Sequence, residues 1–172
     1  HTKTSKIKSI DIVTGFRAKN IENELKGLKV NFIKNKNYAI TDMVYSAMLS
    51  LKNTNVDVII CYTDIVVEKK IFTKLTSKKF SKITVPHLEN WKTVWKNRKK
   101  KIFDDAETFI TNKKNNRIIE IGKKLTNTNY KKTKGQFMGI IYIPKDIIKH
   151  VTNYYEMRDK KKIQFTEFLN FL

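Results

Sequence analysis

The stretch VDVIICY at residues 56–62 decides the fold of this chain. It is apolar nearly throughout, which is typical of a parallel strand that is buried on both faces of a sheet. A helical stripe that contains Val44 and Met48 precedes it, and a helical pattern through Ile71 and Leu75 follows it. A buried strand between two helices indicates a sheet that is covered by helices.

The same alternation continues on both sides of this stretch. Further strands are expected at residues 10–13, 30–33, 83–85, 108–110, 117–121 and 137–143, with helices near residues 21–25 and 91–95, after Pro144, and over an amphipathic last segment, 163–172. The order predicts an α/β fold, a Rossmann-like, mostly parallel mixed sheet with helices on both faces. No linker, repeat or composition shift divides the chain, so a single domain over residues 1–172 is expected.

The net charge of the 172-residue chain is +20, from 36 Lys and Arg against 16 Asp and Glu. Such a charge favours a nucleic-acid or anionic-membrane partner. Its make-up weakens that inference, because Arg, the residue preferred for bidentate phosphate and base recognition, occurs only 4 times. Lys, Asn and Ile supply 70 of the 172 residues, which indicates an AT-rich coding sequence. Because Lys is spread along the whole chain, a basic nucleic-acid-binding module is kept only as the alternative from another class.

Cys61 is the only cysteine, so no internal disulfide can form, and a reducing, cytoplasmic location is expected. No apolar run reaches 18 residues, so no membrane span is expected.

Asp64 follows the buried strand closely. In open α/β sheets, ligands bind outside the carboxyl ends of the strands, so this acid is well placed to hold a divalent cation on a phosphate-bearing ligand. The competing interpretation is a turn or N-cap Asp before the next helix, which position alone slightly favours.

Three acids lie within four residues, Asp104, Asp105 and Glu107, in a chain that is poor in acids. If the segment is extended, Asp105 and Glu107 project to one side. Such a pair could bind Mg²⁺ or the amine of an acceptor. A solvated turn is the alternative interpretation, and it is the commoner outcome.

Two glycine-containing stretches and one aromatic face complete the candidates. Glu120 at a strand end, followed by Gly and Lys123, could place an ammonium against an anionic ligand, although ordinary surface lysine is the alternative. The glycines on either side of Gln136 allow close approach of a ligand or of another backbone, and a β-bulge is the alternative. Trp91 and Trp95 are four residues apart, which is most often core packing, but an aromatic wall could hold a cationic head group.

Taken together, these motifs resemble those of the nucleotidyltransferase superfamily, and in particular of its cytidylyltransferase branch. The matches are IVTGFRA at residues 12–18, TDMVYS at 41–46, CYTDIV at 61–66, the W-x3-W-x2-R spacing of Trp91, Trp95 and Arg98, DAET at 105–108, EIGKK at 120–124 and GQFMG at 135–139. They occur in the same order as in the family and cover roughly residues 10–170. The branch includes enzymes that act on phosphocholine, aminoalkylphosphonates and phosphoglutamine.

The resemblance implies an enzyme that transfers CMP from CTP to a small phosphorylated or phosphonate acceptor and releases pyrophosphate, in the synthesis of cell-surface polysaccharide or phospholipid precursors. It implies that Asp64 binds Mg²⁺ and that Lys123 holds the acceptor phosphate. It places the nucleotide near Thr41, Asp42 and Tyr62, and the acceptor near Trp91, Trp95, Arg98, Asp105, Glu107, Glu120 and Gln136. Transfer to a sugar 1-phosphate is the alternative, against which the tryptophan spacing and DAET argue.

The chain also departs from the family pattern. The Gly-rich loop unit of the family would precede residue 1, and a second metal-binding acid would lie in a strand after Leu172. Asp42 replaces an Asn, which affects base recognition. We therefore expect that these 172 residues alone do not turn over CTP.

Overall fold

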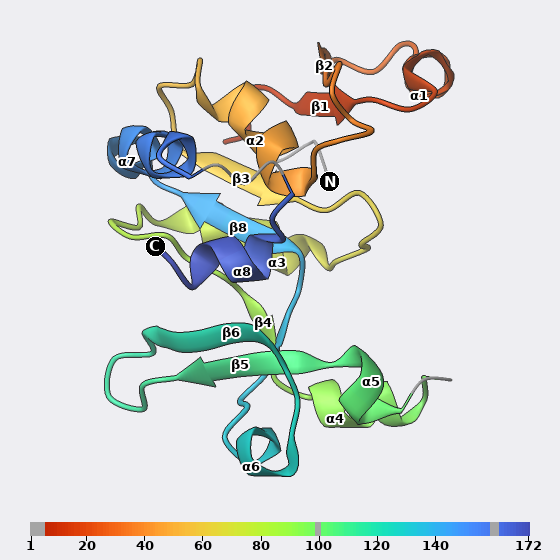
Figure 1. Ribbon diagram of the computed structural model, residues 1–172. Coiled ribbons are helices and arrows are strands. Elements are labelled where there is room, and N and C mark those ends of the chain that lie inside the picture. The colour runs from red at the N-terminus through yellow and green to blue at the C-terminus, as the bar shows by residue number, and fades with distance from the viewer. Residues whose placement is uncertain (1–5, 99–100, 159–161) are drawn as a thin grey trace. The chain divides into compact units, whose positions relative to one another are not determined.

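The computed structural model describes residues 6–98, 101–158 and 162–172, which form eight strands and eight helices (Figure 1). The strands are β1 (Asp11–Thr14), β2 (Asn31–Lys34), β3 (Val58–Cys61), β4 (His87–Leu88), β5 (Glu107–Thr111), β6 (Ile118–Lys124), β7 (Gln136–Phe137) and β8 (Ile140–Ile143). The helices are α1 (Ala18–Glu24), α2 (Met43–Leu51), α3 (Lys69–Ser77), α4 (Trp91–Lys96), α5 (Ile102–Asp105), α6 (Asn127–Tyr130), α7 (Lys145–Glu156) and α8 (Phe165–Leu169). Strands and helices alternate from β1 to α4, which confirms the predicted α/β class.

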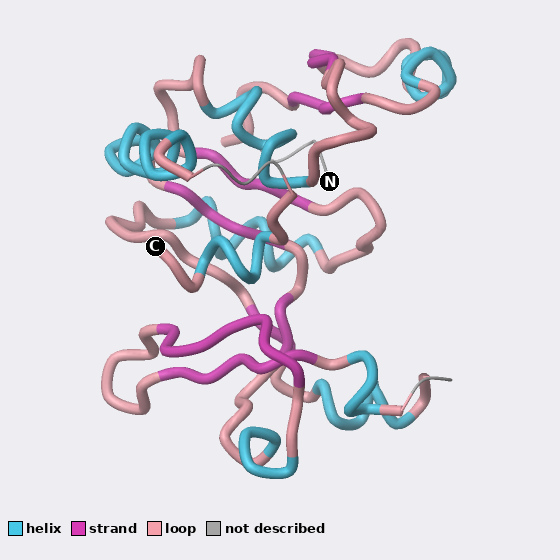
Figure 2. The backbone as a smooth tube through the Cα atoms, in the orientation of Figure 1, coloured by secondary structure: helices cyan, strands magenta, loops and turns pink. Residues whose placement is uncertain are grey.

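The strands pair into several small sheets, whereas the sequence predicts a single sheet. Four two-stranded sheets are formed by the described residues, β1–β2, β3–β8, β4–β7 and β5–β6 (Figure 2). The β1–β2 pair is parallel, whereas β4–β7 and β5–β6 are antiparallel. A continuous, mostly parallel sheet is therefore not seen in the described part of the chain. One reason is local, because β5 and β6 are joined by a short turn that only antiparallel strands can use.

The chain forms two compact units that are interleaved in sequence. The first unit comprises His1–Ile60, Val66–Thr84 and Tyr142–Gln164, and the second comprises Cys61–Ile65, Val85–Ile141 and Phe165–Leu172. Within the described ranges, no helix combines the length and the apolar character that a membrane span requires.

In the first unit, α2 packs against β1 and α7. Its buried face is the predicted stripe, since Val44, Met48 and Leu51 are at most 1% exposed. Asp42 caps this helix, because its side chain accepts a hydrogen bond from the N–H of Met43.

The second unit is built around the β5–β6 hairpin. Its core contains a cluster of four buried residues. Trp91 and Trp95 belong to α4, Ala106 lies directly after α5, and Leu125 lies directly after β6. Helix α8, within the predicted last amphipathic segment, packs against β6. The hairpin and the residues that surround it contain most of the predicted acceptor-binding residues.

Two predicted strands differ in the structure. At residues 83–85 only Thr84 makes a bridge, to Tyr142, and the next strand begins after Pro86, which has no N–H to donate to a ladder. The predicted strand at 137–143 is interrupted between β7 and β8, where Gly139 takes a φ of 72°. The pairing of β7 with β4 therefore ends before Gly139, and the pairing of β8 with β3 begins after it.

Candidate active site

Asp64 lies in an exposed turn two residues beyond Tyr62, after the end of β3. The main-chain N–H of Tyr62 donates to the carbonyl of Gly139 at 2.9 Å, and its ring makes an edge contact with Phe137, with centroids 5.6 Å apart. The N-cap of α3 is Glu68, so the N-cap interpretation of Asp64 does not hold. The turn therefore starts at an anchored residue and leaves the Asp64 carboxylate open to solvent.

The residues that could hold a metal are few. Over the described ranges, no three His, Cys, Asp or Glu side chains gather into a metal-binding group. Mg²⁺ usually binds through one or two carboxylates together with substrate phosphates and water, so the single carboxylate of Asp64 fits a cation that arrives with a nucleotide.

The DAET motif at residues 105–108 is not extended throughout, which corrects the expected geometry of its acids. Asp105 ends α5, whereas Glu107 begins β5. Asp105 accepts a 3.0 Å hydrogen bond from Nη1 of Arg98. Because a helical turn precedes the strand, the two carboxylates are not related by the alternation of a single strand.

Glu107 has an altered acidity. Desolvation raises the pKa of its carboxyl, and a hydrogen bond with the side chain of Thr166 in α8 opposes that rise. A partly desolvated carboxylate is a stronger partner for a cation than a fully hydrated one.

Both acids lie at a hollow of about 430 Å³ in the second unit. Its lining residues are Phe103, Asp104, Asp105, Ala106, Glu107, Gly122 and Lys124. The residues that line this open hollow therefore include three acids, one lysine and one phenylalanine, and its volume lies within the range of small-molecule sites. The sequence predicts the contribution of Asp105 and Glu107 to one site.

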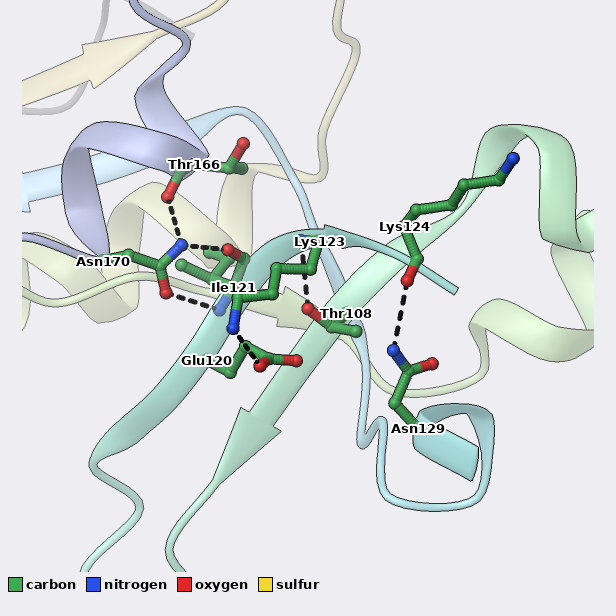
Figure 3. Close-up of polar contacts among 8 residues, drawn as sticks. All are labelled: Thr108, Glu120, Ile121, Lys123, Lys124, Asn129, Thr166 and Asn170. Atoms are coloured by element: carbon green, nitrogen blue, oxygen red, sulfur yellow. Dashed lines mark hydrogen bonds and ion pairs between the residues drawn. The ribbon is translucent and has the colours of Figure 1, made fainter. Parts of the chain in front are cut away.

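The EIGKK motif forms the end of β6 (Figure 3). Lys123 Nζ and Glu120 Oε2 form an ion pair at 2.7 Å, and the Lys123 N–H donates to Oγ1 of Thr108 at 3.1 Å. The main chain of Lys123 is therefore fixed, while its ammonium is paired on an exposed surface, from which an anionic group could recruit it.

Gln136 is buried, and its side chain serves the frame of the site. Its Oε1 accepts from the N–H of Glu107 at 3.1 Å, and its Nε2 donates to the carbonyl of the same residue. The amide thus replaces a strand partner for the main chain at Glu107. In the described contacts Gln136 supports an acid of the hollow rather than facing it.

Trp91 and Trp95 are core residues of the second unit, with exposed fractions of 1% and 8%. Their rings meet edge to face, with centroids 6.2 Å apart. The guanidinium of Arg98 lies 3.8 Å from the centre of the Trp95 ring and also pairs with Asp105. Core packing accounts for the two tryptophans, and Arg98 connects them to the acids of the hollow.

Thr41 and Asp42 belong to the first unit, at the start of α2. Asn35, a buried residue outside the predicted motifs, donates from Nδ2 to Oγ1 of Thr41 at 3.1 Å and to Oγ of Ser46 at the same distance. Gln164 donates to the Asp42 carboxylate at 2.8 Å. A polar residue directly after β2, at a strand's carboxyl end, was the available signal for Asn35.

No protein-family model and no curated protein matches the chain. Solved structures do match it. The inositol-1-phosphate CTP transferase from T. maritima aligns with a TM-score of 0.64 and 17% identity over 94% of this chain and 60% of that chain. A UDP-glucose pyrophosphorylase aligns with a TM-score of 0.59 and 14% identity over 94% of this chain and 68% of that chain.

A Bacillus anthracis protein described as a glucose-1-phosphate thymidylyltransferase aligns with a TM-score of 0.66 and 16% identity, over 99% of this chain and 65% of that chain. The chain thus spans about three fifths of the length of the T. maritima structure. These likenesses show a shared fold: the chain folds like part of these three nucleotidyltransferase structures.

Proposed function

We propose that the protein transfers CMP from CTP to a small phosphorylated or phosphonate acceptor and releases pyrophosphate. The observation that carries the proposal is the hollow beside β6, where acids and a lysine meet on a nucleotidyltransferase fold. Carboxylates alone would repel a phosphorylated molecule, but carboxylates beside an ammonium group suit an acceptor that carries both an amine and a phosphoryl group. The motif order from residue 12 to residue 139 supports the cytidylyl branch.

In the proposed reaction, an oxygen of the acceptor's phosphoryl or phosphonyl group attacks the α-phosphorus of CTP, and the bond to the β-phosphate oxygen breaks. Asp64 would hold Mg²⁺, which neutralises phosphate charge when it is bound. Lys123 would leave Glu120 to hold the acceptor's anionic group. Thr41, Asp42 and Tyr62 would contact the nucleotide. Positioning and charge neutralisation supply most of the rate in such a transfer.

The acceptor's cationic end would lie in the hollow, against Asp105 and Glu107. Glu107 is partly desolvated, and Phe103 adds an aromatic ring to the lining, so a primary or quaternary amine would find both charge and an apolar surface. Phosphocholine, aminoalkylphosphonates and phosphoglutamine all combine such an amine with a phosphorus-containing group.

Transfer to a sugar 1-phosphate or to inositol 1-phosphate is the second candidate. It is favoured by the names of the matching structures, which mention inositol 1-phosphate, UDP-glucose and glucose 1-phosphate. A neutral polyol has no cation to place against Asp105 and Glu107, so the lining of the hollow distinguishes the two candidates.

A pyrophosphate-release screen on the complete gene product tests the proposal. It crosses the four common nucleoside triphosphates with phosphocholine, aminoethylphosphonate, phosphoglutamine, glucose 1-phosphate and inositol 1-phosphate. The proposal predicts release with CTP and at least one amine-bearing acceptor. Release only with a sugar or inositol phosphate would support the second candidate instead.

A further inference from the structure

A row of four aromatic rings begins at the hollow of the second unit. Phe103 lines the hollow, and the centre of its ring lies 5.5 Å from that of Tyr130. The Tyr130 ring lies 5.6 Å from that of Trp91, which in turn lies 6.2 Å from that of Trp95. Aromatic faces are what proteins use to bind quaternary ammonium groups, so the row raises the question of which kind of amine the hollow accepts.

The chain's own cations already lie over three of these rings. The guanidinium carbon of Arg98 is 3.8 Å from the centre of the Trp95 ring. Lys92 Nζ is 4.3 Å from the centre of the Tyr130 ring and 5.6 Å from that of Trp91. Both tryptophans are also buried in the core of the unit. A methylated ammonium group of a ligand would therefore meet like charge at these rings instead of a vacant aromatic face.

Two carboxylates of the hollow remain available to a cation. Asp105 accepts a hydrogen bond from Arg98 at 3.0 Å, so part of its charge is already balanced. Within the described ranges, neither Asp104 nor Glu107 takes part in an ion pair. The side chain of Gln136 binds both the N–H and the carbonyl of Glu107, which fixes the main chain from which that carboxylate extends.

Primary and quaternary ammonium groups differ in the contacts that they can make with this lining. A primary ammonium donates hydrogen bonds to carboxylate oxygens, whereas a quaternary ammonium has no N–H and depends on aromatic faces. The hollow has a volume of about 430 Å³, which is ample for three methyl groups, so size alone gives no preference. The chemistry of the lining therefore favours the primary ammonium.

We propose that the cationic end of the acceptor is a primary ammonium bound by Asp104 and Glu107, and that Lys92 and Arg98 disfavour methylated amines by covering the aromatic faces beside the hollow. This inference rests on the proposed function and deepens it, because it selects one chemical class among the amine-bearing acceptors. It also gives a role to Lys92, which lies outside the predicted motif positions.

A methylation series of acceptors tests the preference with the complete gene product and CTP. Phosphoethanolamine, its N-methyl and N,N-dimethyl derivatives and phosphocholine share the phosphoryl group and differ only in how many methyl groups replace N–H donors. The kcat/KM is expected to fall along the series and to be about tenfold or more lower for phosphocholine than for phosphoethanolamine. Equal values, or a preference for phosphocholine, would overturn the inference and leave the proposed transfer intact.

Lys92→Met tests the part that the aromatic rings play. Removal of this ammonium uncovers the Tyr130 ring, so the kcat/KM for phosphocholine is expected to rise about threefold or more, while that for phosphoethanolamine stays within about twofold. Lys96→Met is the matched control, because Lys96 belongs to the same helix and has no ring contact in the described part of the chain. An unchanged preference in Lys92→Met would contradict the role of Lys92.

Glu107→Gln tests the part that the carboxylates play. The kcat/KM for phosphoethanolamine is expected to fall about tenfold, and that for phosphocholine by clearly less, because only the primary ammonium loses a charged hydrogen bond. Equal losses for the two acceptors would contradict the proposed recognition by hydrogen bonds.

Titration calorimetry of the two acceptors separates the inference from the function beneath it. In a protein that releases no pyrophosphate with any acceptor, binding of phosphoethanolamine about tenfold tighter than phosphocholine would keep the inference and contradict the proposed function. Binding of phosphocholine that is equally tight or tighter, or binding of neither molecule by that protein, would overturn the inference as well.

Discussion

The hydroxyl of Tyr142 in β8 donates a 2.6 Å hydrogen bond to the carboxylate of Asp57, the residue before β3. The same carboxylate accepts from the main-chain N–H of Lys145, the first residue of α7, at 2.9 Å. These hydrogen bonds lower the pKa of Asp57, and desolvation together with the Asp57 contact raises the pKa of Tyr142 to about 12. One carboxylate thus joins the start of β3, the end of β8 and the start of α7.

The Asp57–Tyr142 contact predicts a pH dependence. Because folding lowers the pKa of Asp57, this carboxylate stabilises the fold fully above its ordinary pKa of 3.8. That stabilisation is lost as the pH falls through the lowered pKa. Because folding raises the pKa of Tyr142, its contribution is complete below pH 10 and is lost between pH 10 and about 12. Tyr142→Phe is expected to lower the free energy of unfolding by about 1 kcal/mol at pH 7. The variant should also lose less stability than the wild type at low pH and at high pH.

Urea unfolding at pH 3, 7 and 11 measures these effects. Tyr38→Phe is a suitable control, since Tyr38 is 46% exposed and lies away from Asp57 in the sequence. Equal stability of Tyr142→Phe and the wild type at pH 7 would show that the hydrogen bond contributes nothing.

Because α8 approaches β6 closely at Gly122, we expect a substitution of this glycine to destabilise the protein strongly. Gly122→Ala would place a methyl group against Thr166 in a backbone conformation that disfavours side chains, and we expect a loss of about 2–4 kcal/mol in unfolding free energy. Gly27→Ala separates the two causes, because Gly27 has a φ of 90° and no heavy atom within 4 Å of the added Cβ. Its loss should be about 1–2 kcal/mol. Chemical denaturation of both variants checks the difference, and equal losses would argue against the packing contact.

The exposed ion pair between Lys123 and Glu120 predicts a separation of activity from stability. Lys123→Met is expected to change the unfolding free energy by less than about 1 kcal/mol, because an exposed pair contributes little. The same variant is expected to raise the acceptor KM roughly tenfold to a hundredfold through the loss of a charged hydrogen bond. Kinetics and denaturation on one preparation measure both, with Lys113→Met in the hairpin turn as the control. A normal acceptor KM would remove Lys123 from the acceptor site.

Asp64 is predicted to matter for turnover and not for folding. Asp64→Asn keeps the shape of an exposed turn residue, so the melting temperature should stay near that of the wild type. The proposed metal role predicts a loss of about a hundredfold or more in kcat/KM, and a weaker response to added Mg²⁺. Asp146→Asn in α7 is the matched control on an exposed aspartate. Full activity of Asp64→Asn would exclude it as the metal ligand.

Local pattern was enough to predict much of this fold. The stripe through Val44, Met48 and Leu51 forms the buried face of α2, and the apolar run before Tyr62 contains β3. What local pattern could not supply was the pairing of distant strands, since β3 pairs with β8, which lies about 80 residues later in the chain. Periodicity reports which residues are buried, and it does not report their partners.

The candidate site likewise contains residues that local sequence patterns predict and residues that they do not. Asp105 and Glu107 were predicted to contribute to one site, because charged residues in short clusters are visible in a sequence. The lysine that lines the hollow is Lys124, whereas the predicted lysine was its neighbour Lys123. Thr166 and Asn170 were missed, because a threonine and an asparagine in a terminal amphipathic segment carry no local signal of their contact with β6. Gly122 was the available signal, since a glycine inside a strand often marks close approach of another backbone or side chain.

The central claim is tested most directly by ³¹P NMR of the complete gene product with CTP, Mg²⁺ and an amine-bearing acceptor, phosphocholine or aminoethylphosphonate. The account predicts pyrophosphate and a new CMP-linked product in equal amounts, both dependent on the acceptor and absent with glucose 1-phosphate. Acceptor-independent hydrolysis of CTP, or product formation only with a sugar 1-phosphate, would contradict it.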